Sequence, residues 1–304
     1  MASPFEIAVV GSANLDLVVT VDRIPLAGET VMGGDLRRIP GGKGANQAVA
    51  AARLGRRVAM VGRVGHDEGG AILRSALHND GVDTSMLRTS EGVASGVALI
   101  SVAGDGDNAI VVSPGANDRL TPTDIVSASD VLAHASVTLL QLEVPIDAVT
   151  AAARAAEGTV VLNPAPALHG QLPPELMEAV DILVPNQTEL ATLTGHQHEV
   201  DADTAAELAR RLPCEAVVVT LGAQGALVVD GENTLHVPAP KVEPVDTTAA
   251  GDSFCAALAD ALVGGATVSE ATRWAVRVGA ATTLRAGAQP SLPTRDEVAS
   301  LIPS

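Results

Sequence analysis

Residues 245–254 have the types and order needed to bind an anion and to accept a proton. The small residues Ala249, Ala250 and Gly251 precede an alanine-rich stretch of helical composition. Backbone N–H groups at such a helix start can point at one spot, where the helix dipole favours negative charge. Asp252 follows in the expected first turn, where its carboxylate can serve as a general base beside a phosphoryl group. The alternative is that Asp252 is only the N-cap of this helix.

A second segment, at 41–47, is glycine-rich and opens another expected helix. Its sequence is Gly-Gly-Lys-Gly-Ala-Asn-Gln. It is not a Walker A loop, because Gly44 follows Lys43 where Ser or Thr is required, and Arg37 stands where the first glycine should be. Its backbone can approach a ligand closely, with Lys43 and Asn46 offering donors to hydroxyl groups. The alternative is a glycine-rich helix start with a solvated lysine.

Short β-branched runs alternate along the chain with alanine-rich stretches of helical length. The runs lie at residues 7–10, 58–61, 137–140, 159–162, 181–184 and 216–220. The helical stretches lie at 45–54, 70–77, 146–156, 204–212 and 251–262. This order predicts a single α/β domain over residues 1–304, with a mostly parallel sheet and helices on both faces. Ligands bind at the carboxyl ends of such strands.

Two regions, at about 13–40 and 94–114, break this alternation. The first has turn signals at Pro25 and at 33–34, and the second reads as a hairpin around residues 104–107. Together they predict a small separate sheet. Because its apolar residues must be covered, we expect it to form a lid over the site or the contact between the subunits of a homodimer.

The composition argues against several classes of partner. The chain has 304 residues and a formal net charge of −17, so no basic surface is expected for nucleic acid or acidic membranes. Aromatic residues make up 1%, which leaves few platforms for base stacking. Cys214 and Cys255 are too few for a disulfide framework or a four-ligand zinc site. With no leader at residues 1–6 and no apolar run of about 20 residues, we expect a cytoplasmic protein with small-molecule partners.

The segments at 245–254 and 41–47 both resemble signatures of the ribokinase-like (PfkB) family of sugar kinases. Further segments similar to that family occur in its order at 11–16, 141–143, 163–167, 185–189, 220–225 and 287–291. The resemblance covers essentially the whole chain. It implies a ribokinase-like fold with a small β lid, and ATP-dependent phosphorylation of D-ribose on its 5-hydroxyl to give D-ribose 5-phosphate and ADP.

The resemblance also implies roles for individual positions. Asp252 receives the proton of the sugar hydroxyl, and residues 249–251 form the anion hole. The residues expected to hold the sugar are Asn14, Asp16, Gly42, Lys43, Asn46, Glu143 and Asp252. Carboxylates and amides suit vicinal hydroxyls because they supply paired acceptors and donors. The alternatives are that Asp16 faces solvent and that Glu143 is a solvated strand end.

For the nucleotide and the ions the resemblance implies three sets. The adenine nucleotide is lined by Thr220, Gly222, Ala223, Gln224, Gly225, Gly251 and Val276. Asn186 and Glu189 act on Mg²⁺ and phosphate through water, with Gln187 standing where the family often has Glu. Potassium, a monovalent activator, is held mostly by backbone carbonyls at Asp246, Thr248, Thr282, Arg285, Gly287 and Ser291. Residues 222–225 are also predicted to form a hairpin turn.

Two other groups are assigned no site. The string His-Gln-His-Glu at 196–199 has metal-ligand residue types but no zinc-site spacing, so a polar loop is predicted. Cys255 lies three residues after Asp252, but no histidine is near it in the sequence to activate it.

Four rival functions stay open. A 2-deoxyribose kinase is disfavoured because relatives with that preference resemble this pattern but carry an apolar residue at the position of Asn14. A nucleoside kinase usually needs an aromatic base pocket, and the chain has two Phe, one Trp and no Tyr. A non-catalytic sugar sensor is expected to lose Asp252 or Gly251, and both are present. A structural binding module explains the polar motifs least well.

Overall fold

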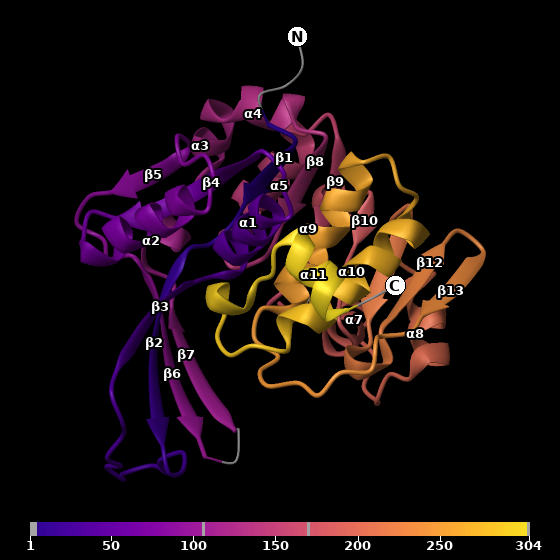
Figure 1. Ribbon diagram of the computed structural model, residues 1–304. Helices are drawn as coiled ribbons and strands as arrows, with labels where there is room; N and C mark the ends of the chain where they lie inside the picture. The colour runs from indigo at the N-terminus through magenta and orange to yellow at the C-terminus, as the bar shows by residue number, and fades with distance from the viewer. Residues whose placement is uncertain (1–4, 105–106, 169–170, 303–304) are drawn as a thin grey trace.

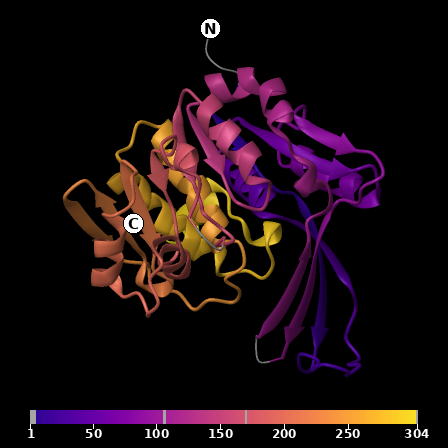
Figure 2. The same cartoon turned by 180° about the vertical axis from the view of Figure 1, so that it is seen from behind.

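The computed structural model describes residues 5–104, 107–168 and 171–302. It contains a nine-stranded sheet inside a helical body and a four-stranded sheet that projects from the body as an arm (Figure 1). Seen from behind, the arm again extends away from the body (Figure 2). The predicted α/β architecture with a small separate sheet is therefore confirmed.

The large sheet has the strand order β13-β12-β11-β10-β9-β8-β1-β4-β5. Neighbours are parallel from β5 to β11, and β12 and β13 are added antiparallel at one edge. Each of the six predicted runs forms a strand. The strands are β1 (Ile7–Val10), β4 (Val58–Gly65), β5 (Leu87–Ser90), β8 (Val137–Leu140), β9 (Thr159–Leu162), β10 (Ile182–Leu183), β11 (Ala216–Thr220), β12 (Ala226–Asp230) and β13 (Asn233–Val237).

Helices cover both faces of this sheet because successive side chains of a strand point to opposite sides. Ile7 and Val9 of β1 pack into one core cluster, and Ala8 and Val10 into the other. The first cluster includes α1 (Lys43–Arg53), α2 (Glu68–Asn79), α9 (Ala250–Val263), α10 (Val268–Thr282) and α11 (Arg295–Leu301). The second includes α3 (Pro122–Ser127), α4 (Ser129–His134), α5 (Ile146–Ala155), α6 (Pro174–Met177), α7 (Gln187–Thr194) and α8 (Ala202–Ala209). Within the described ranges, no helix combines the length and apolar character needed to cross a bilayer.

The arm has the strand order β3-β2-β6-β7. Its strands are β2 (Asn14–Val21), β3 (Arg37–Gly41), β6 (Gly96–Ala103) and β7 (Asn108–Ser113). Strands β2 and β6 are parallel, and the other two pairs are antiparallel. The predicted hairpin joins β6 to β7, although residues 105–106 of its turn lie outside the described part of the chain. Leu99, Ile110 and Val111 are 50%, 53% and 66% exposed, so part of the arm presents apolar side chains to solvent.

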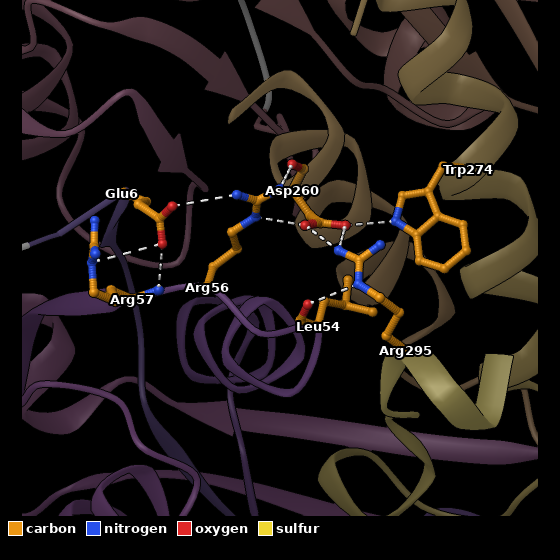
Figure 3. Close-up of polar contacts among 7 residues, drawn as sticks. All are labelled: Glu6, Leu54, Arg56, Arg57, Asp260, Trp274 and Arg295. Carbon is orange, nitrogen blue, oxygen red and sulfur yellow. Dashed lines mark hydrogen bonds and ion pairs between the residues drawn. The ribbon is translucent and has the colours of Figure 1, made fainter. Parts of the chain in front are cut away.

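The end of α9 is anchored by a buried charge cluster (Figure 3). Asp260 is 1% exposed and accepts hydrogen bonds from Arg56 Nε at 2.6 Å and Trp274 Nε1 at 2.7 Å. The Nη2 atom of Arg295 lies 2.7 Å from both carboxylate oxygens of Asp260. A buried carboxylate is stable only when it is paired in this way. Arg56 follows α1, Trp274 lies in α10 and Arg295 begins α11, so the cluster connects these three helices to α9.

Candidate active site

Asp252 lies where the first turns of α1 and α9 meet. Its carboxylate is 6% exposed and accepts two amide hydrogen bonds from α1. Asn46 Nδ2 donates to Oδ2 at 2.9 Å, and Gln47 Nε2 donates to Oδ1 at 3.2 Å. The N-cap of α9 is Ala249, with no side-chain cap, so the interpretation of Asp252 as an N-cap is wrong. The carboxylate instead faces the interior of the site.

The start of α9 has the geometry of an anion-binding turn. Ala249 adopts the left-handed conformation (φ 61°) directly before the helix, an arrangement that aims successive N–H groups to one side. Within the described ranges, neither the Gly251 N–H nor the Asp252 N–H has a protein acceptor. A Cβ added to Gly251 would meet no atom within 4 Å. Open space therefore lies beside two unpartnered donors at a helix N-terminus, as an anion requires.

The predicted sugar residues of β2 point inward, where the arm joins the body. Asn14 is 3% exposed, and its Oδ1 accepts a hydrogen bond of 2.7 Å from Asn117 Nδ2. Asp16 is 9% exposed, so the alternative that it faces solvent is wrong. On β3, Gly41 is the register partner of Asn14, and a Cβ at Gly41 would be 2.3 Å from Asp16 Oδ2. Any side chain at position 41 would therefore clash with the Asp16 carboxylate, and only glycine avoids this clash.

The loop before α1 joins the arm to Glu143. Glu143 Oε2 accepts hydrogen bonds from the Lys43 N–H at 3.0 Å and from Ser12 Oγ at 2.5 Å, so Glu143 is not a solvated strand end. Gly42 has φ 89°, which side chains rarely adopt. The buried Asn46 Oδ1 has no partner among the described residues. Since buried acceptors are normally satisfied, this oxygen is suited to a ligand hydroxyl.

Burial dominates the electrostatics of this group. Burial, followed by the charges of Glu143 and Asp252, raises the pKa of Asp16 to about 7. Burial also raises the pKa of Asp252, against the opposing effects of Lys43 and the two amide donors. For Lys43, burial lowers the pKa, but the surrounding carboxylates outweigh it and the net direction is upward. The site thus holds one ammonium among several carboxylates, which suits polyhydroxyl ligands.

The raised pKa of Asp16 predicts a pH-dependent affinity for the sugar. An ionised carboxylate accepts two hydroxyl donors, so the bound sugar favours the ionised form. With a pKa of about 7, the ionised fraction rises roughly tenfold from pH 6 to pH 8, and we expect KM for ribose to fall by about that factor. Because the folded-state pKa lies above the unfolded value, the stability of the ligand-free protein should decline as pH rises through about 7.

Asp16→Asn is the matched control for this pH dependence. Its side chain does not titrate, so its KM should be nearly constant between pH 6 and pH 8, and its melting temperature at pH 8 should exceed that of the wild type. A wild-type KM that does not change over this range would contradict the assignment.

A cavity of about 420 Å³ opens beside the start of α9. This volume is within the range of small-molecule sites. Of the predicted nucleotide residues, those that line it are Thr220, Gly222, Ala223, Gly225, Gly251 and Val276. Gln224 does not line it, and the Gln224 carbonyl instead bonds the His236 ring. Lys241 also lines the cavity. Lys43, the other lysine of the sequence, lies beside Glu143 instead.

Asn186 and Glu189 are engaged with each other's backbone. The Glu189 N–H donates to Asn186 Oδ1 at 2.8 Å, and the Asn186 N–H donates to Glu189 Oε2 at 2.8 Å, forming a capping box at the start of α7. Asn186 forms a β-bridge with Thr220, which places the pair beside the nucleotide cavity. Burial raises the pKa of Glu189. Gln187 Nε2 donates to the Val200 carbonyl, so this side chain points away from the pair.

The two segments predicted to hold a monovalent cation are brought together. Asp246 Oδ1 accepts from the Thr248 N–H at 2.9 Å, and Asp246 Oδ2 accepts from the Gly287 N–H at 2.8 Å. The other side chains of the set are engaged elsewhere: Thr282 Oγ1 with Ser253, Arg285 with Glu297 and Ser291 Oγ with the Ala288 carbonyl. With these side chains engaged, the prediction that a cation is held by backbone carbonyls stays open.

Several site residues were not identified from the sequence. Gln47, Gln141 and Asn163 form hydrogen bonds that lead to Asp252, and Asn117 orients Asn14. Phe254 lines the nucleotide cavity. All of them except Asn117 belong to segments quoted for the resemblance, so their position within a motif was the available signal.

A larger open hollow, of about 770 Å³, lies at the opposite end of the sheet. It is formed where β9 and β11 begin, and it contains none of the predicted site residues. Its acidic lining residues include Glu157, Glu178, Asp181 and Glu215. A polyanion such as ATP would be repelled there, so the smaller cavity beside Gly251 is the better nucleotide site.

Comparisons with known proteins agree with this geometry. The model of the pfkB family carbohydrate kinases matches residues 5–295. The chain is 40% identical to the ribokinase of Bacillus subtilis, over 98% of this chain and 99% of the relative. The crystal structure of ribokinase from Thermotoga maritima superposes with a TM-score of 0.90 at 34% identity, covering 99% of this chain and all of the other. The structure of Arabidopsis thaliana ribokinase complexed with ribose and ATP has a TM-score of 0.89 at 33% identity, with both chains fully covered. The chain therefore belongs to the pfkB family of carbohydrate kinases.

Proposed function

We propose that the protein is an ATP-dependent ribokinase, which transfers the γ-phosphoryl group of ATP to the 5-hydroxyl of D-ribose and releases D-ribose 5-phosphate and ADP. The observation that carries this proposal is the place of the Asp252 carboxylate. It lies between the buried polar residues of the arm junction and the start of α9, where Gly251 opens onto the nucleotide cavity. A sugar hydroxyl and a phosphoryl group can meet beside this carboxylate.

The chemistry follows from this arrangement. The 5-hydroxyl oxygen attacks the γ-phosphorus in line, the bond to the ADP oxygen breaks, and the hydroxyl proton passes to Asp252. The transition state is loose and the proton leaves late, so a weak base suffices. The larger contribution comes from positioning and from the unpartnered N–H donors of Gly251 and Asp252, which stabilise the transferring phosphoryl group.

Selectivity for ribose is proposed to rest on Asn14. Its Oδ1 is occupied by Asn117, which leaves the Nδ2 donors for a ligand. A sugar without the 2-hydroxyl would leave buried polar groups unpaired, and this is costly. The same argument disfavours 2-deoxyribose as the preferred substrate.

Mg²⁺, K⁺ and a homodimer complete the proposal. Glu189, buried beside the nucleotide cavity, fits a metal held through water, where Mg²⁺ neutralises phosphate charge. Residues 246–248 and 282–291 fit K⁺ through their carbonyl oxygens. The exposed apolar side chains of the arm support a dimer formed arm to arm. Cys214 and Cys255 are both free, which supports a cytoplasmic location.

The test is ADP formation with MgATP and D-ribose, 2-deoxyribose, fructose or adenosine, each with potassium or with sodium alone. We expect kcat/KM for ribose to exceed that for 2-deoxyribose by at least about tenfold, with stimulation by potassium. Asn14→Met should narrow this ratio, since it removes the polar group that rewards the 2-hydroxyl. Ribose binding without ADP formation would instead indicate a sugar sensor.

A further inference from the structure

A chain of buried amides leads from the core of the large sheet to Asp252. Gln47 and Gln141 are fully buried, and Gln141 Nε2 donates to Gln47 Oε1 at 2.6 Å. Gln47 Nε2 in turn lies 3.2 Å from Asp252 Oδ1 and 3.4 Å from Asn163 Oδ1. Asn163 Nδ2 donates to the Val184 carbonyl at 2.9 Å. We call Asn163, Gln141 and Gln47 the amide relay.

The direction of these hydrogen bonds is set by the carboxylate. An ionised Asp252 can only accept, so Gln47 must present its NH₂ group to it. The Gln47 oxygen then faces Gln141, which must also present its NH₂ group. Because Asn163 gives its NH₂ group to Val184, its oxygen is left for the second N–H of Gln47. Asn163, fixed by Val184, therefore favours the orientation of Gln47 that donates to Asp252, and the NH₂ group of Gln141 satisfies the Gln47 oxygen in that orientation.

Within the described part of the chain, this arrangement leaves one polar atom of Gln141 without a hydrogen-bond partner. Its Oε1 is buried and has no partner among the described residues. A Cβ added to Gly11 would lie 2.0 Å from this oxygen, so glycine leaves the space that the side chain occupies. An apolar residue at position 141 would avoid an unpaired buried oxygen, which is unfavourable. Packing alone therefore does not explain a glutamine at position 141, whereas the need to orient Gln47 does.

We propose that Gln47 is a positioning residue for Asp252, and that the amide relay holds this carboxylate ionised and oriented toward the sugar hydroxyl. The proposal rests on the proposed role of Asp252 as base. Asn46 donates to one carboxylate oxygen and Gln47 to the other, so neither oxygen can rotate away without losing a donor. Hydrogen bonds to a charged acceptor are the stronger kind.

Other titratable groups also lie near Asp252, and their effects on its pKa must be separated from that of Gln47. They are Lys43 on α1, Asp16 on β2, Glu143 after β8, Glu189 on α7 and Cys255 on α9. In this proposal the bound sugar keeps Asp16 ionised. The titration of Asp16 therefore appears chiefly in the pH profile of the sugar-free enzyme. The pH profile of kcat at saturating ribose reports the groups of the enzyme–substrate complex and is the profile to measure.

Gln47→Met keeps the shape of the side chain and removes its donor. We expect kcat to fall by about tenfold, with KM for ribose changed by less than about threefold, because the lost hydrogen bond serves a charged group. The ionised form of Asp252 loses a donor, so its pKa rises and the acid limb of kcat should move upward by about one pH unit. Gln141→Met, which removes the orienting neighbour, should shift the limb in the same direction by less.

Thr138→Val is the matched control, since the Thr138 hydroxyl is buried in neighbouring β8 and has no partner among the described residues. It should leave kcat and its pH profile unchanged. The proposal would be overturned if Gln47→Met lost turnover without a shift in the acid limb of its kcat profile. It would also be overturned if Gln47→Met kept the turnover of the wild type. If Gln47→Met does not fold, an unmoved limb in Gln141→Met overturns it. Asp252→Asn, assayed in parallel, separates the two failures: if it retains turnover, the base itself is wrongly assigned.

Discussion

Asp252→Asn is expected to lower kcat by about 10³-fold, the scale of a lost general base in a positioned site. The amide cannot accept the proton of the 5-hydroxyl, although its oxygen can still accept a hydrogen bond. Ribose affinity should stay within about tenfold of the wild type, because the remaining sugar contacts are kept and one neutral hydrogen bond is worth about 1 kcal/mol. Turnover is measured by ADP release and binding by titration calorimetry.

Folding must be shown to survive this change. The substitution removes a buried charge whose pKa burial has raised, but it leaves Asn46 and Gln47 with one acceptor oxygen instead of two. We expect these effects to offset each other and the melting temperature to change by less than about 3 °C. Asp203→Asn, at an exposed aspartate in the first turn of α8, is the control and should change neither property. Near-normal turnover in Asp252→Asn would remove Asp252 from the mechanism.

Gly251→Leu is expected to abolish most of the activity without harming the fold. A Cβ at this position meets no atom within 4 Å, so the larger side chain enters the space where the phosphoryl group must lie. We expect kcat/KM for ATP to fall by about a hundredfold or more, the scale seen when anion-hole stabilisation is lost. Gly251 is in the first turn of α9, and leucine is a better helix former than glycine, so stability should be equal or higher.

Gly251→Ala provides the graded control, since one methyl group fills less of the space. Its activity should lie between those of the wild type and Gly251→Leu, while ribose binding in both variants should be unchanged. Nucleotide binding is measured by titration with ADP, and folding by thermal unfolding. Full activity in Gly251→Leu would place the phosphoryl group elsewhere in the cavity.

Much of the fold follows from local patterns. The runs at 137–140, 159–162 and 216–220 coincide with β8, β9 and β11, because β-branched residues between alanine-rich helices specify a parallel sheet directly. Pairing between distant segments is less visible. In the arm, β2 and β6 pair parallel across some 80 residues of sequence, and no local pattern indicates which strands become neighbours.

Only those candidate site residues that belong to recognisable motifs could be predicted from the sequence. Asp16, Glu143 and Asp252 lie close enough for their charges to interact, whereas their roles toward a ligand stay predictions. The partners of these residues were hidden because they depend on tertiary approach: the hydrogen bond between Gln47 and Gln141 joins residues 94 positions apart. Asn186 and Glu189, expected from the resemblance to serve a metal, form the capping box of α7, a role that residue types alone do not reveal.

The scarcity of lysine gives this protein built-in reporters of both substrates. The sequence has only Lys43, whose amide donates to Glu143 in the sugar site, and Lys241, at the wall of the nucleotide cavity. Selective ¹⁵N-lysine labelling would therefore yield a spectrum of two backbone amide resonances, without any engineered probe. One resonance would follow the arrival of sugar and the other that of nucleotide, so the order in which the two substrates bind becomes directly observable.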